Sequence, residues 1–297
     1  MRSLIVLAVV GLLAQLVDGS LGMAYGVTST TLLLAVGITP ALASASVHIA
    51  EMGTTLMSGV AHWRFGNVDW SKILWMAIPG GVGAFLGAVI LSSISAEAAK
   101  PYIAVFLFGL GVYILARFSF RRKEKPVRVR PIPGKFLGPL GLVAGFLDAA
   151  GGGGWGPIST PTLLSSGRME PRKIIGTVDT SEFVVASCAS VGFLLALSVS
   201  EIPFDVVGAL LVGGLVAAPG AAWLVRLLPM RILGTAVGGV ILITNMRTFL
   251  GAIGISGGTA TIVYVLIVVV WLAALAFSIW VNRQDKARGS VAEGQPA

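Results

Sequence analysis

The sequence predicts an all-α integral membrane protein with two inverted repeats. Of its 297 residues, 56% are hydrophobic and only 11% are charged, and the mean hydropathy is +0.91. A soluble domain carries about 25% charged residues, so the composition excludes that class. Apolar runs of span length recur along the chain, and one glycine-rich motif occurs twice. We expect each repeat to hold a glycine-broken or re-entrant helix pair followed by three spans, with one extra C-terminal span.

Matching residues at a nearly constant separation indicate the duplication. Residues 18–30 match 148–160 at a shift of 130, and residues 40–51 match 171–182 at a shift of 131, after one inserted residue. The chain is therefore a duplicated unit. The matched pairs include Asp18 with Asp148, Gly22 with Gly152, Tyr25 with Trp155, Ser29-Thr30 with Ser159-Thr160, His48 with Asp179, and Glu51 with Glu182.

Seven apolar runs are long enough to cross a bilayer, which takes about 20 residues. Their glycine and alanine content suits close helix contact, and no alternating barrel pattern is present. The runs are 40–62, 71–91, 101–118, 171–197, 204–224, 232–250 and 259–281.

The N-terminal run could be mistaken for a signal peptide, because Arg2 precedes an apolar stretch. It lacks a convincing cleavage pattern and occupies the same place in its copy as residues 136–147 do in the other, so we assign it to the fold. The arms beside each break, such as 4–17 and 27–36, reach only about 15–21 Å. The predicted organisation is membrane repeat 1 (1–118), a basic linker (119–135), membrane repeat 2 (136–252), a last transmembrane helix (253–281) and a polar tail (282–297).

Charge placement predicts the orientation. Seven of the 21 basic residues lie between Arg121 and Lys135, which places that loop in the cytoplasm by the positive-inside rule. Later loop charges favour a re-entrant second pair of arms, inverted repeats and a cytoplasmic C-terminus in a multi-pass protein of the inner (plasma) membrane. Parallel repeats remain the alternative. The net charge of +8 thus reflects topology, not a nucleic-acid partner.

The glycine breaks are the first candidate site. Unwound backbone inside a membrane is tolerated where it lines a cavity or is buried in protein, and N–H groups at a helix start bind anions. The alternative is that the glycines only allow close helix packing. Residues expected to bind a small anion are Gly22, Tyr25, Thr28, Ser29 and Thr30 in the first copy, and Gly152, Gly153, Trp155, Ser159 and Thr160 in the second.

Carboxylates within apolar spans form the second candidate. Glu51 and Glu182 lie deep in their runs, where a charge costs about 3 kcal/mol, so we expect them to carry protons, with His48 and Asp179 as further coupling residues. The alternative is a hydrogen-bonded cluster that only locks helices together. On the first of these helices, a polar face comprises His48, Glu51, Thr55, Ser58 and His62, of which His62 is expected at the interface.

Asp18 and Asp148 directly precede the two breaks. Each is expected to have a structural role, accepting N–H bonds from the unwound backbone, because a carboxylate beside an anion would repel it. For Arg247, near the end of its span, an interfacial position and substrate contact remain equally open.

Metal and enzyme chemistry receive less support. His48, Glu51, Asp179 and Glu182 together would suit a divalent ion, but no dense His/Cys cluster is present, so neither a metal site nor a cofactor is expected. The chain contains no nucleophile elbow, Walker loop or His-Glu-x-x-His pattern, so it is not expected to be an enzyme. The single Cys188 lies in an apolar run and supports no disulfide.

The duplicated motifs 18–26 and 148–157, with the Gly-Gly-Gly-Gly-Trp-Gly-Pro run, resemble those of the TauE/SafE family of sulfite and organosulfonate exporters, also called the toluene sulfonate uptake permease group. The resemblance covers about residues 4–281. It implies a secondary transporter of sulfite, sulfoacetate or other organosulfonates, driven by protons. The first copy departs from the full motif at Ser20, Met23 and Ala24, which places equal contributions of the two copies in doubt.

The expected function is proton-coupled, alternating-access transport of such anions within the lipid bilayer. The alternatives are a passive anion channel, a divalent-metal transporter, and a membrane-embedded enzyme or sensor. The exact anion, the direction of transport and the oligomeric state are left open by the sequence.

Overall fold

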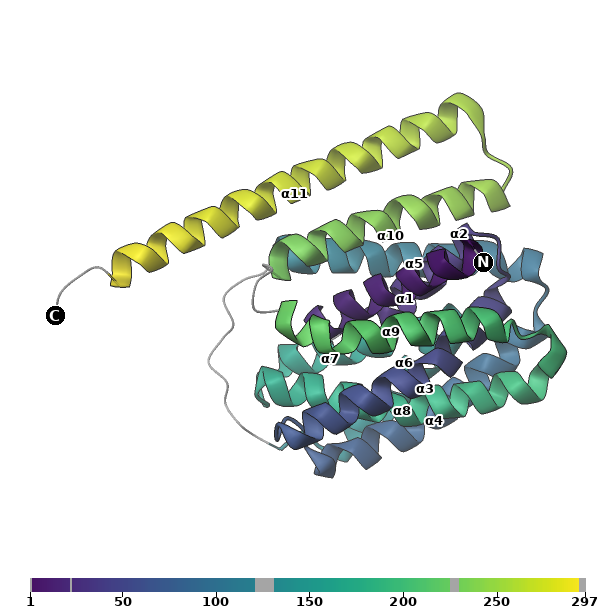
Figure 1. Ribbon diagram of the computed structural model, residues 1–297, viewed down its shortest axis with the longest axis horizontal. Coiled ribbons are helices and arrows are strands. Elements are labelled where there is room, and N and C mark those ends of the chain that lie inside the picture. Colours follow the sequence, from purple (N-terminus) through teal and green to yellow (C-terminus); the bar gives the residue numbers. More distant parts are fainter. Residues whose placement is uncertain (1, 22, 121–130, 225–229, 294–297) are drawn as a thin grey trace.

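The computed structural model describes residues 2–21, 23–120, 131–224 and 230–293. Within these ranges every regular element is a helix, and the helices form a bundle (Figure 1). They are α1 (Arg2–Leu21), α2 (Tyr25–Ala35), α3 (Pro40–Arg64), α4 (Trp70–Ser93), α5 (Ala96–Ser119), α6 (Gly134–Gly151), α7 (Trp155–Ser166), α8 (Pro171–Ala196), the short 3₁₀ helix η1 (Val199–Glu201), α9 (Phe204–Leu224), α10 (Met230–Ala252) and α11 (Gly257–Glu293).

All seven predicted spans are helical. Five helices in the described ranges are long and apolar enough to cross a membrane, namely α4, α5 and most of α8, α10 and α11. In α9, the apolar stretch found is the shorter Phe204–Ala217. α3 does not qualify although it has 25 residues, because His48, Glu51 and several serines and threonines make it polar. The composition of α3 is that of a helix enclosed by protein.

The helix breaks are shorter than the sequence predicted. α1 continues through Asp18 and Gly19 to Leu21, and α6 continues to Gly151. With 20 residues, α1 is about 30 Å long rather than the shorter arm expected. A glycine inside a helix costs about 1 kcal/mol, which packing against another helix offsets.

The first helix of each half, α1 in one and α6 in the other, packs against a helix of the opposite half. α1 packs mainly on α9, and α6 packs mainly on α4. The backbones approach so closely that a Cβ on Gly11 would overlap the carbonyl of Leu210, and one on Gly145 would overlap that of Gly80. Small residues permit such approach in membrane helices. α5 with α10, α4 with α8, and α3 with α8 and α9 are further contacts between the halves.

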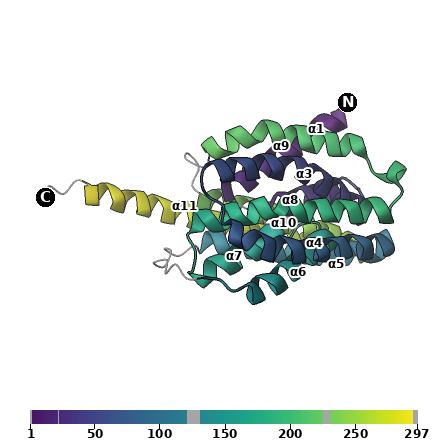
Figure 2. The same ribbon diagram turned by 90° about the horizontal axis from the view of Figure 1, so that it is seen from below.

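Helix connections gather at two opposite ends of the bundle. The N-terminus lies at the same end as the α2–α3, α4–α5 and α8–α9 connections, and the α3–α4 and α7–α8 connections lie at the other (Figure 1). α11 lies at the edge of the bundle and projects beyond it in both views (Figures 1 and 2). Its apolar window is only 6% buried, and Ser278 Oγ, 2.9 Å from Thr235 Oγ1, connects it to α10.

Candidate functional site

Asp148 accepts the hydrogen bonds that cap both helix ends at the second break, the C-terminus of α6 and the N-terminus of α7. Its main-chain carbonyl accepts from the N–H groups of Gly152 and Gly153, at 2.8 and 2.9 Å. Its Oδ1 accepts from the N–H groups of Gly154 and Trp155, at 2.6 and 2.9 Å. The first pair satisfies the C-terminus of α6 and the second pair caps the N-terminus of α7. One residue therefore fixes the angle between the two helices.

The first break follows the same plan with fewer bonds. Asp18 Oδ1 accepts from the N–H of Tyr25 at 3.2 Å, where α2 begins. The residue before Tyr25 is Ala24, whose φ of 101° is left-handed, a conformation that costs a residue with a Cβ more than it costs glycine. At the second break the left-handed residues are both glycines, Gly152 and Gly153. The predicted site residue Gly22 lies outside the described residues.

His48 connects α3 to the second break. Its Nδ1 lies 2.8 Å from the carbonyl oxygen of Ser44 and its Nε2 lies 3.2 Å from Asp148 Oδ2. A carbonyl only accepts, so Nδ1 carries a proton, and a second proton lies between Nε2 and the carboxylate. Because the other oxygen of Asp148 accepts two amide hydrogens, the geometry favours an imidazolium–carboxylate pair. His48 thereby neutralises the carboxylate that the sequence suggested would repel an anion.

The two breaks contact each other in the centre of the bundle. A Cβ on Gly26 would lie 2.9 Å from Gly153 Cα, and one on Gly153 would overlap the backbone nitrogen of Val27. Gly152 lies against the side chain of Thr30 in the same way. Glycine is required here because the backbone at the start of α2 approaches the second break more closely than any side chain allows.

Unpaired hydroxyl groups surround this contact. Four buried hydroxyls among the predicted anion-binding residues have no hydrogen-bond partner: those of Thr28, Ser29 and Thr30 at the start of α2, and of Ser159 at the start of α7. Thr160 is fully buried beside Ser159. Buried polar groups are nearly always paired, so several unpaired groups in one place indicate space for a ligand.

Carboxyl groups lie close to these hydroxyls. Glu51 Oε2 is buried without a partner, and Glu51 Oε1 would lie 3.2 Å from a Cβ on Gly26. Glu182 is partly exposed and interacts electrostatically with Glu51. It also interacts with Asp18, Asp148 and Asp179, so Glu182 lies within electrostatic range of four other carboxyl groups.

The two aromatic residues at the breaks are packed against neighbouring helices. Trp155 is fully buried, its Nε1 donates to the carbonyl of Val178 at 3.0 Å, and its ring lies against Gly80 of α4. Tyr25 donates its hydroxyl to the carbonyl of Leu210 in α9 at 3.4 Å. Both side chains connect a break to the opposite half of the chain.

Sequence reasoning missed two residues of this region. Ser44 donates to the carbonyl of Ala149 at 2.7 Å and lies one turn before His48, on the polar face already noted. Asn245 of α10 donates to Thr31 Oγ1 at 2.8 Å, and its buried Oδ1 has no partner. A single asparagine within an apolar run was the signal that could have identified it.

Other polar residues lie away from the breaks. His62 is in the last turn of α3, with its Nδ1 3.5 Å from Asn67 Nδ2. Arg247 is exposed on α10. Within the described ranges, no three His, Cys, Asp or Glu side chains are grouped so that they could hold a metal ion.

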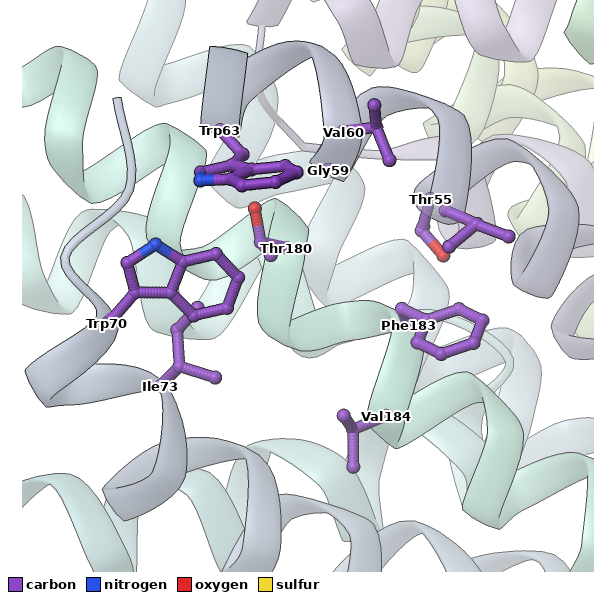
Figure 3. Close-up of a pocket in the computed structure, with 10 residues that line it drawn as sticks. Thr55, Gly59, Val60, Trp63, Trp70, Ile73, Thr180, Phe183 and Val184 are labelled. Atoms are coloured by element: carbon purple, nitrogen blue, oxygen red, sulfur yellow. The ribbon is translucent and has the colours of Figure 1, made fainter. Parts of the chain in front are cut away.

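A separate cavity of about 230 Å³ lies between α3, α4 and α8. Its lining is mostly apolar, and it includes Trp63 and Trp70, whose ring centroids are 6.4 Å apart in an edge-to-face arrangement. Figure 3 shows the Thr180 hydroxyl pointing toward these rings and Phe183 farther along the cavity. The cavity provides few hydrogen-bond donors for an anion. None of the predicted anion-binding or proton-coupling residues lines it, although α3 and α8 carry some of them elsewhere along their length.

The fold and the site together define a helical membrane transporter. Broken helices that meet inside a bundle, with unsatisfied polar groups between them, are the plan on which many transporters build a substrate site. The apolar helices make this a multi-pass membrane protein.

The chain belongs to the sulfite exporter TauE/SafE family, whose model matches residues 7–248. It is 51% identical over 278 residues to the probable membrane transporter protein YtnM of Bacillus subtilis (strain 168), covering 93% of each chain. It is 25% identical over 218 residues to the probable membrane transporter protein YjnA of the same strain, covering 67% of this chain and 86% of the relative. No solved structure matches. The resemblance noted from the glycine motifs is confirmed.

Proposed function

We propose that this protein is a secondary transporter of small sulfur-containing anions, such as sulfite or an organosulfonate, and that it couples their movement to protons. The observation that carries the proposal is the set of unpaired hydroxyls at the starts of α2 and α7, on the two sides of the contact between the breaks. An oxyanion placed there would accept from these hydroxyls and from helix N-termini, whose dipoles favour negative charge.

The charge balance of the site supports proton coupling. The charged side chains buried at the breaks are carboxyls, with His48 as the only described base among them, and His48 already pairs with Asp148. An anion entering beside several ionised carboxylates would meet strong repulsion. Protonation of Glu51 and Glu182 as the anion binds removes that repulsion, and it makes proton and anion move together.

Alternating access completes the proposal. α3 and α8 run in opposite directions in Figure 1, which supports two inverted repeats. Rocking of one repeat against the other about the contact between the breaks would expose the site to each side in turn. The basic residues around the α3–α4 and α7–α8 connections, at one end of the bundle, support a cytoplasmic location for that end in the inner membrane.

The test is uptake of labelled sulfite, with sulfoacetate in parallel, into proteoliposomes with and without an inward proton gradient. We expect saturable uptake that the gradient accelerates, and that loses this acceleration in Glu182→Gln. Flux that neither saturates nor exchanges would indicate a passive channel. Absence of any anion flux would contradict the proposal.

The excess of carboxyl groups is the observation that favours a divalent-metal transporter as second candidate. The same vesicles, loaded with a metal-sensitive dye, test this directly. Entry of a divalent cation that Glu51→Gln abolishes, without anion uptake, would replace the anion proposal.

A further inference from the structure

The fourth helix of each half packs on the other half. These helices are α4 and α9, and each follows the long helix that carries the buried carboxylates of its half, α3 or α8. α4 packs mainly on α6 and α8 of the second half, and makes much less contact with α3, its neighbour in the chain. α9 packs mainly on α1 and α3 of the first half. The two halves have therefore exchanged their fourth helices.

The exchanged helices are held by contact between backbones. Two close approaches add to those already described for the same helix pairs. A Cβ on Gly83 of α4 would overlap the carbonyl oxygen of Leu142 in α6, and one on Gly213 of α9 would overlap that of Ala8 in α1. Helices whose backbones touch at several points cannot slide past each other without opening gaps that side chains do not fill. Each of these two pairs therefore moves as one unit.

The contact between α3 and α8 is of a different kind. A Cβ on Gly59 of α3 would lie 3.5 Å from Thr180 of α8, which is an ordinary van der Waals distance. Contacts of this kind can be exchanged for others when packed helices shift by about 1–2 Å. α3 approaches α9 more closely, because a Cβ on Gly53 would overlap the side chain of Leu211. The surface between α3 and α8 is thus the one along which the two sides of the bundle can slide.

We propose that transport moves two bodies that differ from the two repeats of the sequence. One body consists of α1, α2, α3 and α9, and the other of α4, α6, α7 and α8. The boundary between them runs along α3 and α8 and through the contact between the breaks, whereas α5, α10 and α11 pack mainly on one another. This inference rests on the proposed function and assigns its moving parts. The connections 65–69 and 197–203, which join the two bodies, bend in each transport cycle.

A disulfide between α4 and α8 distinguishes these bodies from rigid repeats. A Cβ on Gly81 would lie 3.4 Å from the Cβ of Cys188, close to the distance of about 3.5–4.5 Å found in disulfides. Gly81→Cys therefore gives the native cysteine a partner. The disulfide joins the two halves of the chain but lies within one proposed body, so the oxidised protein should retain sulfite uptake in proteoliposomes. If each repeat moved as a unit, the same disulfide would block uptake.

The matched cross-link lies across the proposed boundary. Gly59→Cys together with Thr180→Cys, in a Cys188→Ser background, joins α3 to α8 where the two positions are in van der Waals contact. We expect oxidation of this variant to abolish uptake and a reductant to restore it, so the reduced protein is its own control. Uptake that oxidation of Gly81→Cys reversibly abolishes would overturn the proposal. Uptake that persists in the oxidised boundary pair would do the same.

Distances between spin labels test the same motion without measuring transport. Leu56 of α3, Ile90 of α4 and Phe136 of α6 are exposed and can each be replaced by a labelled cysteine in the Cys188→Ser background. Leu56 and Ile90 lie in one half but in different bodies, whereas Ile90 and Phe136 lie in different halves but in one body. For the protein in nanodiscs, sulfite or mild acid should change the first distance and leave the second unchanged.

The two measurements also separate this inference from the proposed function. The reverse pattern of label distances, or no change in either pair, would overturn the two bodies. If the unmodified protein transports no anion, the proposed function fails, whereas the label distances still decide which helices move together.

Discussion

His48 Nε2 lies 3.2 Å from Asp148 Oδ2, and this contact joins the polar helix of the first half to the helix break of the second. Asp148 also caps α7, so the orientation of that helix depends on a residue 100 positions earlier in the chain. The bond thus joins the two halves, and it neutralises the Asp148 carboxylate beside the unpaired hydroxyls.

Replacing Asp148 separates these roles. Asp148→Ala removes the bonds to Gly154, Trp155 and His48 and leaves a buried imidazolium, so we expect a loss of about 3–5 kcal/mol in unfolding free energy. Asp148→Asn keeps an acceptor for the amides and should cost far less, because its amide nitrogen can donate to neutral His48. Thermal unfolding in detergent measures both. Equal losses of unfolding free energy in the two variants would show that an oxygen accepting from the Gly154 and Trp155 amides does not stabilise the fold.

Gly153 tests the contact between the breaks. Gly153→Ala combines a left-handed backbone, φ 144°, with overlap against the backbone of Val27, so we expect no folded protein by size-exclusion chromatography. Gly167→Ala is the control, since Gly167 is also left-handed at φ 61° but has open space around it. That variant should lose only about 1–2 kcal/mol. Similar stability of the two variants would contradict the close contact.

The unpaired hydroxyls should matter for the substrate but not for stability. Ser29→Ala and Ser159→Ala remove groups without partners, so the unfolding temperature should stay the same or rise. Their KM for the transported anion should increase about 10- to 100-fold, because a hydrogen bond to a charged group contributes about 1.5–3 kcal/mol. Ser44→Ala removes a bond to Ala149 and should instead lower stability. An unchanged KM in the first two variants would move the anion site elsewhere.

Trp155 should act through packing. Trp155→Phe loses the bond to the Val178 carbonyl and some contact with Gly80, so we expect about 1–3 kcal/mol less stability with little change in KM. Uptake kinetics and thermal unfolding on the same preparation separate the two effects. A large rise in KM at unchanged stability would place the indole against the substrate.

Much of the helical order was predictable because it depends on local composition. Glycine runs interrupt helices, so the breaks before Tyr25 and Trp155 were placed to within a few residues. The lengths of α1 and α6 were underestimated, since packing against α9 and α4 carries each helix through its glycines. Those pairings could not be predicted, because membrane helices are apolar on all sides and lack a stripe that identifies a partner.

The sequence identified candidate site residues, but it could not identify their hydrogen-bond partners. The internal match pairs His48 with Asp179, but such a match does not indicate contact, and the partner of His48 in the structure is Asp148. The unpaired state of Ser29 and Ser159 depends on how the two breaks meet, which no local pattern encodes. The assignment of protons to Glu51 and Glu182 stays a prediction.

The pairing of α1 with α9 also sets an order of assembly. Gly11 of α1 contacts Leu210 of α9, so α1 reaches its main neighbour only after the helices between them have been synthesised. Until then, the face of α1 that includes Gly11 is exposed to lipid or to an insertion factor. Two separately expressed halves, 1–118 and 136–252, would each lack the surface that covers their first helix. We therefore expect neither half to accumulate alone, and the two to rescue each other when produced together.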